Sequence, residues 1–565
     1  MKSPKLRLPR SWLRYDILLA SLGINLFALG IPIVTLQIYD RILPNKAHET
    51  LGFLIAALIG IAILDGFLRI SRAVILAWKG AAYEHRQSLS ILRHILSSDL
   101  VSFESRPKGV YLDRFQALEQ VREFYCGHSI LLMLDLPFVF VFLGLIWLFA
   151  GNLVLIPVAV ILVFLVVSVF TGLSLRSALQ RRSESDERRQ NFTIESLQGI
   201  HSIKAMVMEP QMMRRYERLQ GQSADAIYVL TRATSMSQAL GVTFSQLVMV
   251  SFLTIGSIVA VSGQLSIGAL AAGTLLAGRV LQLAMKALAL WTHFQTARLA
   301  RDKVSELLAL PTEHNTAQSD VATLSGAIDL VNVSFCHEGS QQQLLNNVCL
   351  HIAAGESVGI TGANGVGKST LLHLIMGFVR PTSGQILLDG KDLETLDRSS
   401  VRSQIGFAPQ RGMLFDGTLL ENMTLFREGD AVDNALALAR KLNLDTTITH
   451  LPEGLDTRVG SSTVDSLPEG FRQRLIVVRA LVGDVKIVLF DDANSGFDDK
   501  DDVRLVALLE ELKQTCTLVL VSHRPSLLKL CERGYRLDET GVHLMFGHEP
   551  SADEPQELGD LARAS

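Results

Sequence analysis

A glycine-rich run holds the residues whose chemistry is clearest from the sequence. Residues 362–369 are Gly-Ala-Asn-Gly-Val-Gly-Lys-Ser, which fits the phosphate-binding pattern G-x-x-x-x-G-K-[ST]. Glycines let backbone N–H groups turn towards phosphates, the lysine contacts the β- and γ-phosphates, and the serine hydroxyl can ligate Mg²⁺. The run follows an apolar, strand-like segment and opens a helical one, as this chemistry requires. We therefore predict a nucleoside triphosphate site formed by Gly362, Asn364, Gly365, Gly367, Lys368, Ser369 and Thr370.

The elements around this loop divide the chain into two halves. Of the 565 residues, 48% are hydrophobic, and mean hydropathy is positive at +0.30, which is unusual for a protein with a wholly polar surface. Six apolar stretches are each long enough to cross roughly 30 Å of hydrocarbon as a helix. They are residues 17–38, 51–68, 130–149, 153–175, 239–261 and 267–291. The predicted fold class is an α-helical membrane domain with six spans, followed by an α/β phosphate-loop NTPase domain.

Basic residues set the predicted orientation. They are frequent before the first span, between Arg72 and Arg122 after the second, and between Arg176 and Arg232 after the fourth. The opposite side has only Arg41 and Lys46, so both termini and the nucleotide half are predicted to lie in the cytoplasm of a bacterial inner membrane. The net charge of −3 argues against nucleic acid as a partner. The five cysteines show no paired spacing and are interpreted as reduced.

Residues 326–546, which include the phosphate loop, resemble an ATP-binding cassette, because five further short motifs follow the loop in that family's order. The resemblance implies that the nucleotide is ATP. It also implies that Mg²⁺ is bound by Ser369, by Gln410 and by Asp491, which ends the run Val-Leu-Phe-Asp. Gln410 would also sense the γ-phosphate. Asp492 stands at the position that polarises the attacking water, and His523 matches the switch histidine. His337 stands at the adenine-stacking position, Pro468 and Gly470 lie in the signature segment, and Asp498 ends the segment similar to the D-loop, residues 495–498. The resemblance implies that these four residues also contact the nucleotide.

Three departures from the family pattern bear on catalysis. The signature Leu-Ser-Gly-Gly-Gln appears at residues 467–471 as Leu-Pro-Glu-Gly-Phe, which removes a phosphate-facing hydroxyl and introduces a carboxylate. Asp492 replaces a glutamate and is shorter by one methylene. Ser461 stands where related exporters have a glutamate. Each change alone is consistent with neutral drift, but the three together predict impaired hydrolysis.

The membrane half is similar to type I secretion exporters, particularly those of proteases and large adhesins. Residues 37–45, which read Gln-Ile-Tyr-Asp-Arg-Ile-Leu-Pro-Asn, resemble the first external turn of that group, with further matches at residues 135–138 and 278–281. Residues 103–114 and 195–205 look like the two cytoplasmic coupling regions that touch nucleotide domains. Only a short basic segment precedes the first span, so the N-terminal peptidase-like domain of some relatives is not expected.

The expected organisation is a membrane domain over residues 1–310, a linker over 311–325, the cassette domain over 326–546 and a disordered tail over 547–565. Five polar residues within or beside the spans would be costly facing lipid and are expected to point into the bundle. They are Asn25, Asp65, Asp135, Arg279 and Lys286. Structural pairing and a role in the translocation path are the two interpretations.

These resemblances imply ATP-driven export by a dimer across the inner membrane. The implied cargo is an unfolded secreted polypeptide, and the implied partners are a periplasmic adaptor and an outer-membrane channel. One alternative is an exporter of lipids, peptides or drugs. Another is a regulatory half that binds ATP, hydrolyses it weakly and forms a heterodimer with a paralogue of full consensus.

Overall fold

The computed structural model describes residues 15–313, 323–337, 339–340, 342–460 and 467–548. The chain divides into two compact units, Met1–Thr312 and Glu313–Ser565. Ser461 and the tail from residue 549 fall outside the described residues.

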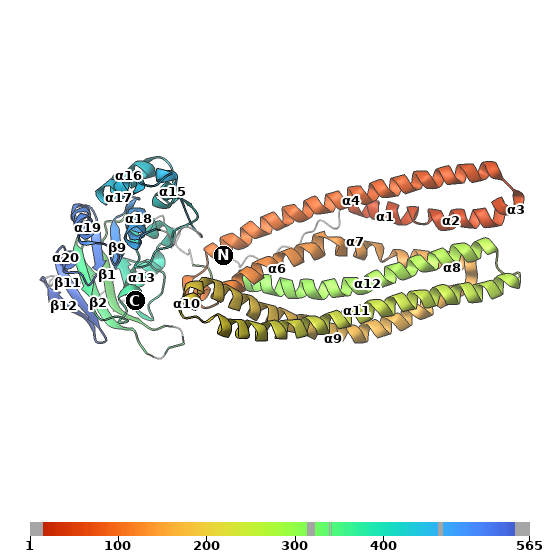
Figure 1. The fold of residues 1–565 in the computed structure, drawn as a ribbon, viewed down its shortest axis with the longest axis horizontal. Coiled ribbons are helices and arrows are strands. Elements are labelled where there is room, and N and C mark those ends of the chain that lie inside the picture. The colour runs from red at the N-terminus through yellow and green to blue at the C-terminus, as the bar shows by residue number, and fades with distance from the viewer. Residues whose placement is uncertain (1–14, 314–322, 338, 341, 461–466, 549–565) are drawn as a thin grey trace. The chain divides into compact units, whose positions relative to one another are not determined.

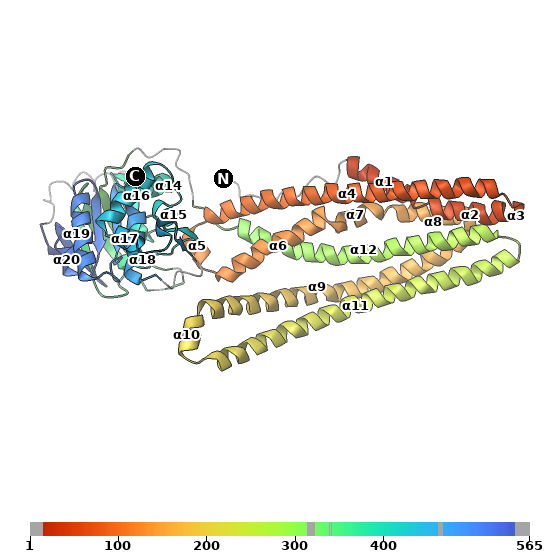
Figure 2. The same ribbon diagram turned by 45° about the horizontal axis from the view of Figure 1, so that its top comes forward.

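The described part of the first unit is helical (Figures 1 and 2). Two long helices, α9 and α11, lie side by side, and α12 packs against α6 and α8. The helices in chain order are α1 (Tyr15–Phe27), α2 (Gly30–Gln37), α3 (Leu43–Asn45), α4 (His48–Leu96), α5 (Leu100–Glu104), α6 (Lys108–Cys126), α7 (His128–Asp135), α8 (Phe138–Ala150), α9 (Leu155–Gln198), α10 (Ile200–Ala205), α11 (Glu209–Val261) and α12 (Ile267–Leu308).

Five intervals of the described helices are long and apolar enough to cross a membrane: Tyr15–Asn45, His48–Leu96, Lys108–Val167, Glu209–Val261 and Ile267–Ala287. The third interval contains the third predicted span and the start of the fourth, with the 3-10 helix Gly151–Val154 between them. The four longest helices have 42 to 53 residues. At 1.5 Å per residue they measure roughly 63–80 Å, about twice the hydrocarbon thickness or more.

Two prolines coincide with breaks in these helices. Pro32 lies in α2, and four residues before it the chain leaves the α-helical pattern, with Leu29 N donating to Leu26 O at 3.0 Å. Pro137 separates α7 from α8, and Val139 N donates to Leu136 O at 3.1 Å. Proline lacks an N–H and its ring clashes with the carbonyl four residues earlier, so both breaks follow from the sequence.

A buried polar cluster joins α1, α4 and α7. Asn25 Nδ2 donates to Asp135 Oδ1 at 2.9 Å, and Arg72 Nη1 lies 3.4 Å from the same oxygen and 2.8 Å from Ser21 Oγ. All four residues are buried. Arg72 is one of the basic residues expected in a cytoplasmic connection, whereas here it neutralises Asp135 inside the bundle, because a buried carboxylate requires a partner.

The three other polar residues of the spans differ in their surroundings. Asp65 pairs with Arg69 one turn later, with 2.7 Å between Oδ2 and Nε. Arg279 and Lys286 are exposed on the surface of α12. Structural pairing therefore accounts for Asn25, Asp65 and Asp135, while the two basic residues of α12 have exposed side chains.

A second polar contact closes the turn between α2 and α3, where a π-helical segment covers Ile38–Ile42. Asp40 accepts hydrogen bonds from Ser266 Oγ at 2.6 Å and from Gly268 N at 2.9 Å, at the amino end of α12. A carboxylate is favoured there because the first N–H groups of a helix lack partners. A side chain at position 268 would meet Asp40 at 2.6 Å, which explains the glycine.

The second unit is built on a six-stranded sheet in the order β12-β11-β3-β10-β9-β6. The five strands from β11 to β6 pair in parallel, and β12 pairs antiparallel with β11. The bounds are β12 (Gly541–Phe546), β11 (Arg533–Asp538), β3 (Ser357–Thr361), β10 (Thr517–Val521), β9 (Ile487–Asp491) and β6 (Ile405–Ala408). Strands β3, β9 and β10 are almost fully buried, as expected of parallel strands covered on both faces.

Smaller elements complete the second unit. An antiparallel sheet has the order β2-β1-β4-β5, and a short pair joins β7 to β8. Their bounds are β1 (Ile328–Phe335), β2 (Leu345–Ile352), β4 (Ser383–Leu388), β5 (Lys391–Asp392), β7 (Gly417–Thr418) and β8 (Arg458–Val459). The helices are α13 (Lys368–Ile375), α14 (Arg398–Arg402), α15 (Leu419–Thr424), α16 (Asp430–Lys441), α17 (Leu444–Ile448), α18 (Glu469–Leu481), α19 (Asp499–Leu512) and α20 (Pro525–Leu528).

Candidate active site

Four parallel strands bring the predicted motifs to one edge of the sheet. In the pairing register, Val521 of β10 stands beside Asp491 of β9 on one side and Ile360 of β3 on the other. β6 ends beside Phe490 of β9. The carboxyl ends of parallel strands share an edge, so the phosphate loop, Asp491, His523 and Gln410 all follow strands that end there. Sequence order alone does not show this adjacency.

The phosphate loop connects β3 to α13. Gly367 precedes the helix with a φ of 102°, and a Cβ there would meet Leu345 at 2.9 Å, so both conformation and space require glycine. Lys368 is buried, and its Nζ donates to Gly362 O at 2.8 Å and to Ala363 O at 2.9 Å. The loop thus curls around the ammonium group. Asn364 and Gly365 are exposed at its tip, and Thr370 is half-buried in the first turn of α13.

Ser369 and Asp491 face each other at the start of α13 and the end of β9. Burial raises the pKa of the Asp491 carboxyl, the adjacent Asp492 adds to this, and a hydrogen bond from the Ser369 side chain opposes it. A hydroxyl beside a carboxylate supplies the hard oxygen donors that Mg²⁺ prefers. Phosphate oxygens and water complete such sites, so the donor set fits Mg²⁺ bound with a triphosphate.

Asp492 has an unusual backbone conformation. Its φ is +45°, and its N–H donates to Val521 O at 2.9 Å, which holds it against β10. Aspartate tolerates this left-handed region better than most residues do. The shorter side chain at this position is evident from the sequence, whereas the backbone conformation has no signal there.

The predicted signature segment leads into α18. Pro468 is its exposed N-cap and offers no side-chain hydrogen bond, and Gly470 lies in the first turn. Glu469 forms an ion pair with Arg472 one turn later. Its negative charge is therefore partly neutralised, and the amino end of a helix favours a carboxylate. The introduced acid is better accommodated than the sequence alone indicated.

Contacts from α18 extend to the predicted D-loop. Gln473 Nε2 donates to Ser495 Oγ at 2.7 Å, and Gln473 Oε1 accepts from Gly496 N at 2.7 Å. Asp498 caps α19, since its Oδ1 accepts from Asp501 N at 2.7 Å. Backbone N–H donors lower the pKa of the Asp498 carboxyl, so this side chain has a structural role that the sequence analysis did not assign. Gln473, which was missed as a bridge, lies within the basic run after the signature.

The remaining predicted residues lie in loops. His523 and Gln410 are exposed, in the segments just after β10 and β6. His337 is exposed after β1, with its ring 5.0 Å from that of Phe335 in an edge arrangement. Arg524 was not predicted, yet its Nη2 donates to Phe497 O at 3.0 Å and its Nη1 lies 3.1 Å from Asp502. It therefore ties the segment around His523 to the D-loop.

Comparison with known proteins gives matches over both units. Residues 16–285 match the family model of the ABC transporter transmembrane region, and residues 345–495 match the ABC transporter family model. The leukotoxin export ATP-binding protein of Aggregatibacter actinomycetemcomitans is 30% identical over 93% of this chain and 74% of its own length. The α-hemolysin translocation ATP-binding protein of Escherichia coli is 30% identical over 96% and 77%.

A solved structure agrees with the fold. A bacterial Atm1-family ABC exporter with ATP bound superposes with a TM-score of 0.83 over 99% of this chain and 97% of that one, at 20% identity. The predicted fold class, a helical membrane domain followed by an ATP-binding cassette, is thereby confirmed.

Proposed function

The chain belongs to the ABC transporter family of exporters, and we propose that it exports an unfolded polypeptide as the inner-membrane component of a type I secretion system. As a multi-pass inner-membrane protein it couples ATP hydrolysis to transport, and exporters of this kind work as dimers. The observation that carries the proposal is 30% identity, over more than nine tenths of the chain, to proteins named for the export of leukotoxin and α-hemolysin. A periplasmic adaptor and an outer-membrane channel would complete the path.

Within the site, we assign roles by position. Lys368 and the N–H groups of residues 362–369 would hold the β- and γ-phosphates, with His337 against the adenine. Ser369, Asp491 and Gln410 would hold Mg²⁺, which offsets phosphate charge. Asp492 would orient the attacking water, and His523 would contact the γ-phosphate. Pro468, Gly470 and Asp498 would approach the nucleotide of the opposite subunit.

A second candidate function is that of a regulatory half with weak hydrolysis. It is favoured by the short Asp492 side chain and by Pro468, which cannot donate the hydrogen bond of the family's serine. In a homodimer both sites would carry both changes. Pairing with a paralogue of full consensus would leave one change in each site, so turnover by the heterodimer should exceed that of the homodimer.

Secretion itself tests the proposal. The chain would be expressed together with a periplasmic adaptor, an outer-membrane channel and a candidate secreted polypeptide from the same organism, and the polypeptide would be measured in the medium and in cells. We expect it in the medium with the unmodified chain and only inside cells with Lys368→Ala. If the polypeptide stays inside the cells with the unmodified chain as well as with Lys368→Ala, at equal expression, this cargo class would be rejected in favour of a smaller substrate.

ATP binding can be tested separately. Lys368→Ala removes a charge-assisted contact worth roughly 1.5–3 kcal/mol, so ATP affinity of the purified chain should fall about tenfold or more. Lys391→Ala, at an exposed position in β5, is the matched control and should leave affinity unchanged. Equal affinity in both variants would place the nucleotide elsewhere.

A further inference from the structure

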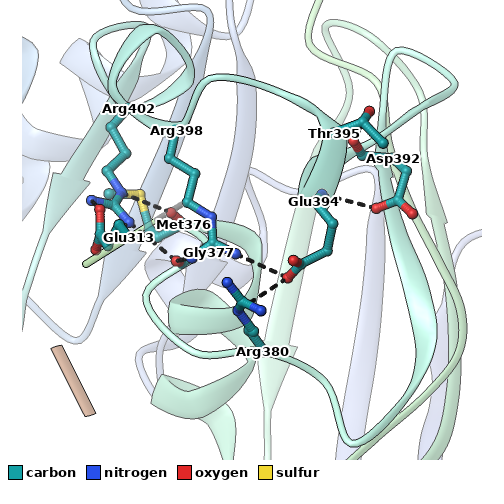
Figure 3. Close-up of polar contacts among 9 residues, drawn as sticks. All are labelled: Glu313, Met376, Gly377, Arg380, Asp392, Glu394, Thr395, Arg398 and Arg402. Atoms are coloured by element: carbon teal, nitrogen blue, oxygen red, sulfur yellow. Dashed lines mark hydrogen bonds and ion pairs between the residues drawn. The ribbon is translucent and has the colours of Figure 1, made fainter. Parts of the chain in front are cut away.

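Glu313, the first residue of the second unit, forms a two-point ion pair with Arg402 at the end of α14 (Figure 3). Arg402 Nη1 lies 2.8 Å from Glu313 Oε2, and Nη2 lies 3.0 Å from Oε1. The side chains are 22% and 20% exposed. A guanidinium bound at two points fixes direction as well as distance. From the sequence alone, this segment is predicted only to be a polar linker.

Arg402 also holds the carboxyl end of α13. Its Nε donates to Met376 O and its Nη2 to Gly377 O, both at 3.1 Å, and its guanidinium carbon lies 4.8 Å from the centre of the Phe378 ring. These carbonyls follow the last residue of α13, whose amino end forms the phosphate loop. At eight residues, α13 is roughly 12 Å long. Arg402 therefore connects Glu313 to the helix that carries Lys368.

The two residues before Glu313 are held within the first unit. Asp99 N donates to Pro311 O at 2.9 Å, and Ser98 and Thr312 form an isolated β-bridge. Ser98 and Asp99 connect α4 to α5. Pro311 and Thr312 are thus hydrogen-bonded to the segment that follows α4, and the next residue, Glu313, is bound to Arg402.

We propose that Glu313 and Arg402 are a positioning pair that couples the phosphate loop to the chain entering the membrane unit. A phosphate that displaces α13 moves its terminal carbonyls, Arg402 follows them through two hydrogen bonds, and Glu313 follows Arg402. The displacement then reaches the Asp99–Pro311 hydrogen bond along two residues of backbone. The inference rests on the proposed ATP site at residues 362–369.

Hydrogen exchange of the full-length chain in lipid nanodiscs, with and without MgATP, tests this coupling. In the unmodified chain we expect MgATP to slow exchange in the phosphate loop and to change the Asp99 amide rate by about fivefold or more. Glu313→Gln keeps the shape and removes the charge. It should keep the protection at the phosphate loop, while the response at Asp99 falls below about twofold.

Glu394→Gln is the matched control. It removes the 2.9 Å ion pair with Arg398, whose Nη1 donates to Gly377 O at the same helix end, without altering Glu313 (Figure 3). It should respond to MgATP as the unmodified chain does. The coupling is rejected if Glu313→Gln also responds fully at Asp99, or if the unmodified chain shows protection at the loop and no change at Asp99. Absent protection at the loop would instead reject the ATP site.

Discussion

At the residue scale, we predict that Asp492 limits how fast the protein can hydrolyse ATP. Its carboxylate is drawn back by about 1.5 Å relative to a glutamate, and a misplacement near 1 Å can cost roughly a hundredfold in rate. We predict turnover at least about tenfold below the ordinary enzyme median of about 10 s⁻¹ and an increase in Asp492→Glu. The increase should come with some loss of stability, because the φ of +45° suits aspartate better than glutamate.

Asp492→Asn is the control for this prediction. It keeps the size and removes the base, so turnover of the purified chain should fall further. Turnover near the enzyme median in the unmodified chain, unaltered by Asp492→Glu, would mean that the departures from consensus have no catalytic effect, and the regulatory reading would be dropped.

Two cysteines give a second prediction at this scale. Burial raises the pKa of the Cys531 thiol to about 12, so at pH 8 roughly one molecule in ten thousand carries the reactive thiolate. Cys349 is exposed. In folded protein, iodoacetamide should alkylate Cys349 and leave Cys531 unmodified between pH 7 and 9, as read by peptide mass spectrometry. Both should react after denaturation, and equal labelling in the folded protein would contradict the burial of Cys531.

At the element scale, the sequence was most informative where function resides in contiguous residues. The phosphate loop, the Asp491 strand and the membrane helices could be predicted because each has a local pattern. The pairs Arg72–Asp135, Asp40–Gly268 and Glu313–Arg402 could not, because they are separated by 63, 228 and 89 positions. Only the packing of whole helices or strands brings such residues together. The assigned roles of the site residues stay predictions.

The Asp40 contact gives a prediction for an element junction. Asp40→Ala would leave Ser266 and the amino end of α12 without their acceptor, at a cost of about 1–3 kcal/mol. The midpoint temperature of thermal unfolding, measured on the purified Asp40→Ala chain in detergent, should therefore fall by a few degrees. Thr35→Val removes only a hydrogen bond to Ile31 O one turn earlier in the same helix, α2, and should have a smaller effect. Equal midpoints for Asp40→Ala and the unmodified chain would show that this turn is held by other contacts.

At the scale of the whole molecule, the basic connections predict which side of the membrane each segment faces. Lys46 ends the external turn and is exposed, whereas Arg189 lies on α9 in the predicted cytoplasmic part, with Nη1 3.0 Å from Gln220 Oε1. In intact cells an impermeant thiol reagent should label Lys46→Cys but not Arg189→Cys. Arg189→Cys should react after permeabilisation, and its labelling in intact cells would overturn the six-span topology.

The unbroken length of α11 has a mechanical consequence. Its 53 residues contain one proline, Pro210, at the very start, so nothing in the rest of the sequence interrupts the backbone hydrogen bonding as Pro32 and Pro137 do elsewhere. A rod of roughly 80 Å converts a tilt of about 5° at one end into a displacement of about 7 Å at the other. A small tilt at one end of α11 would therefore produce a much larger displacement at the other end.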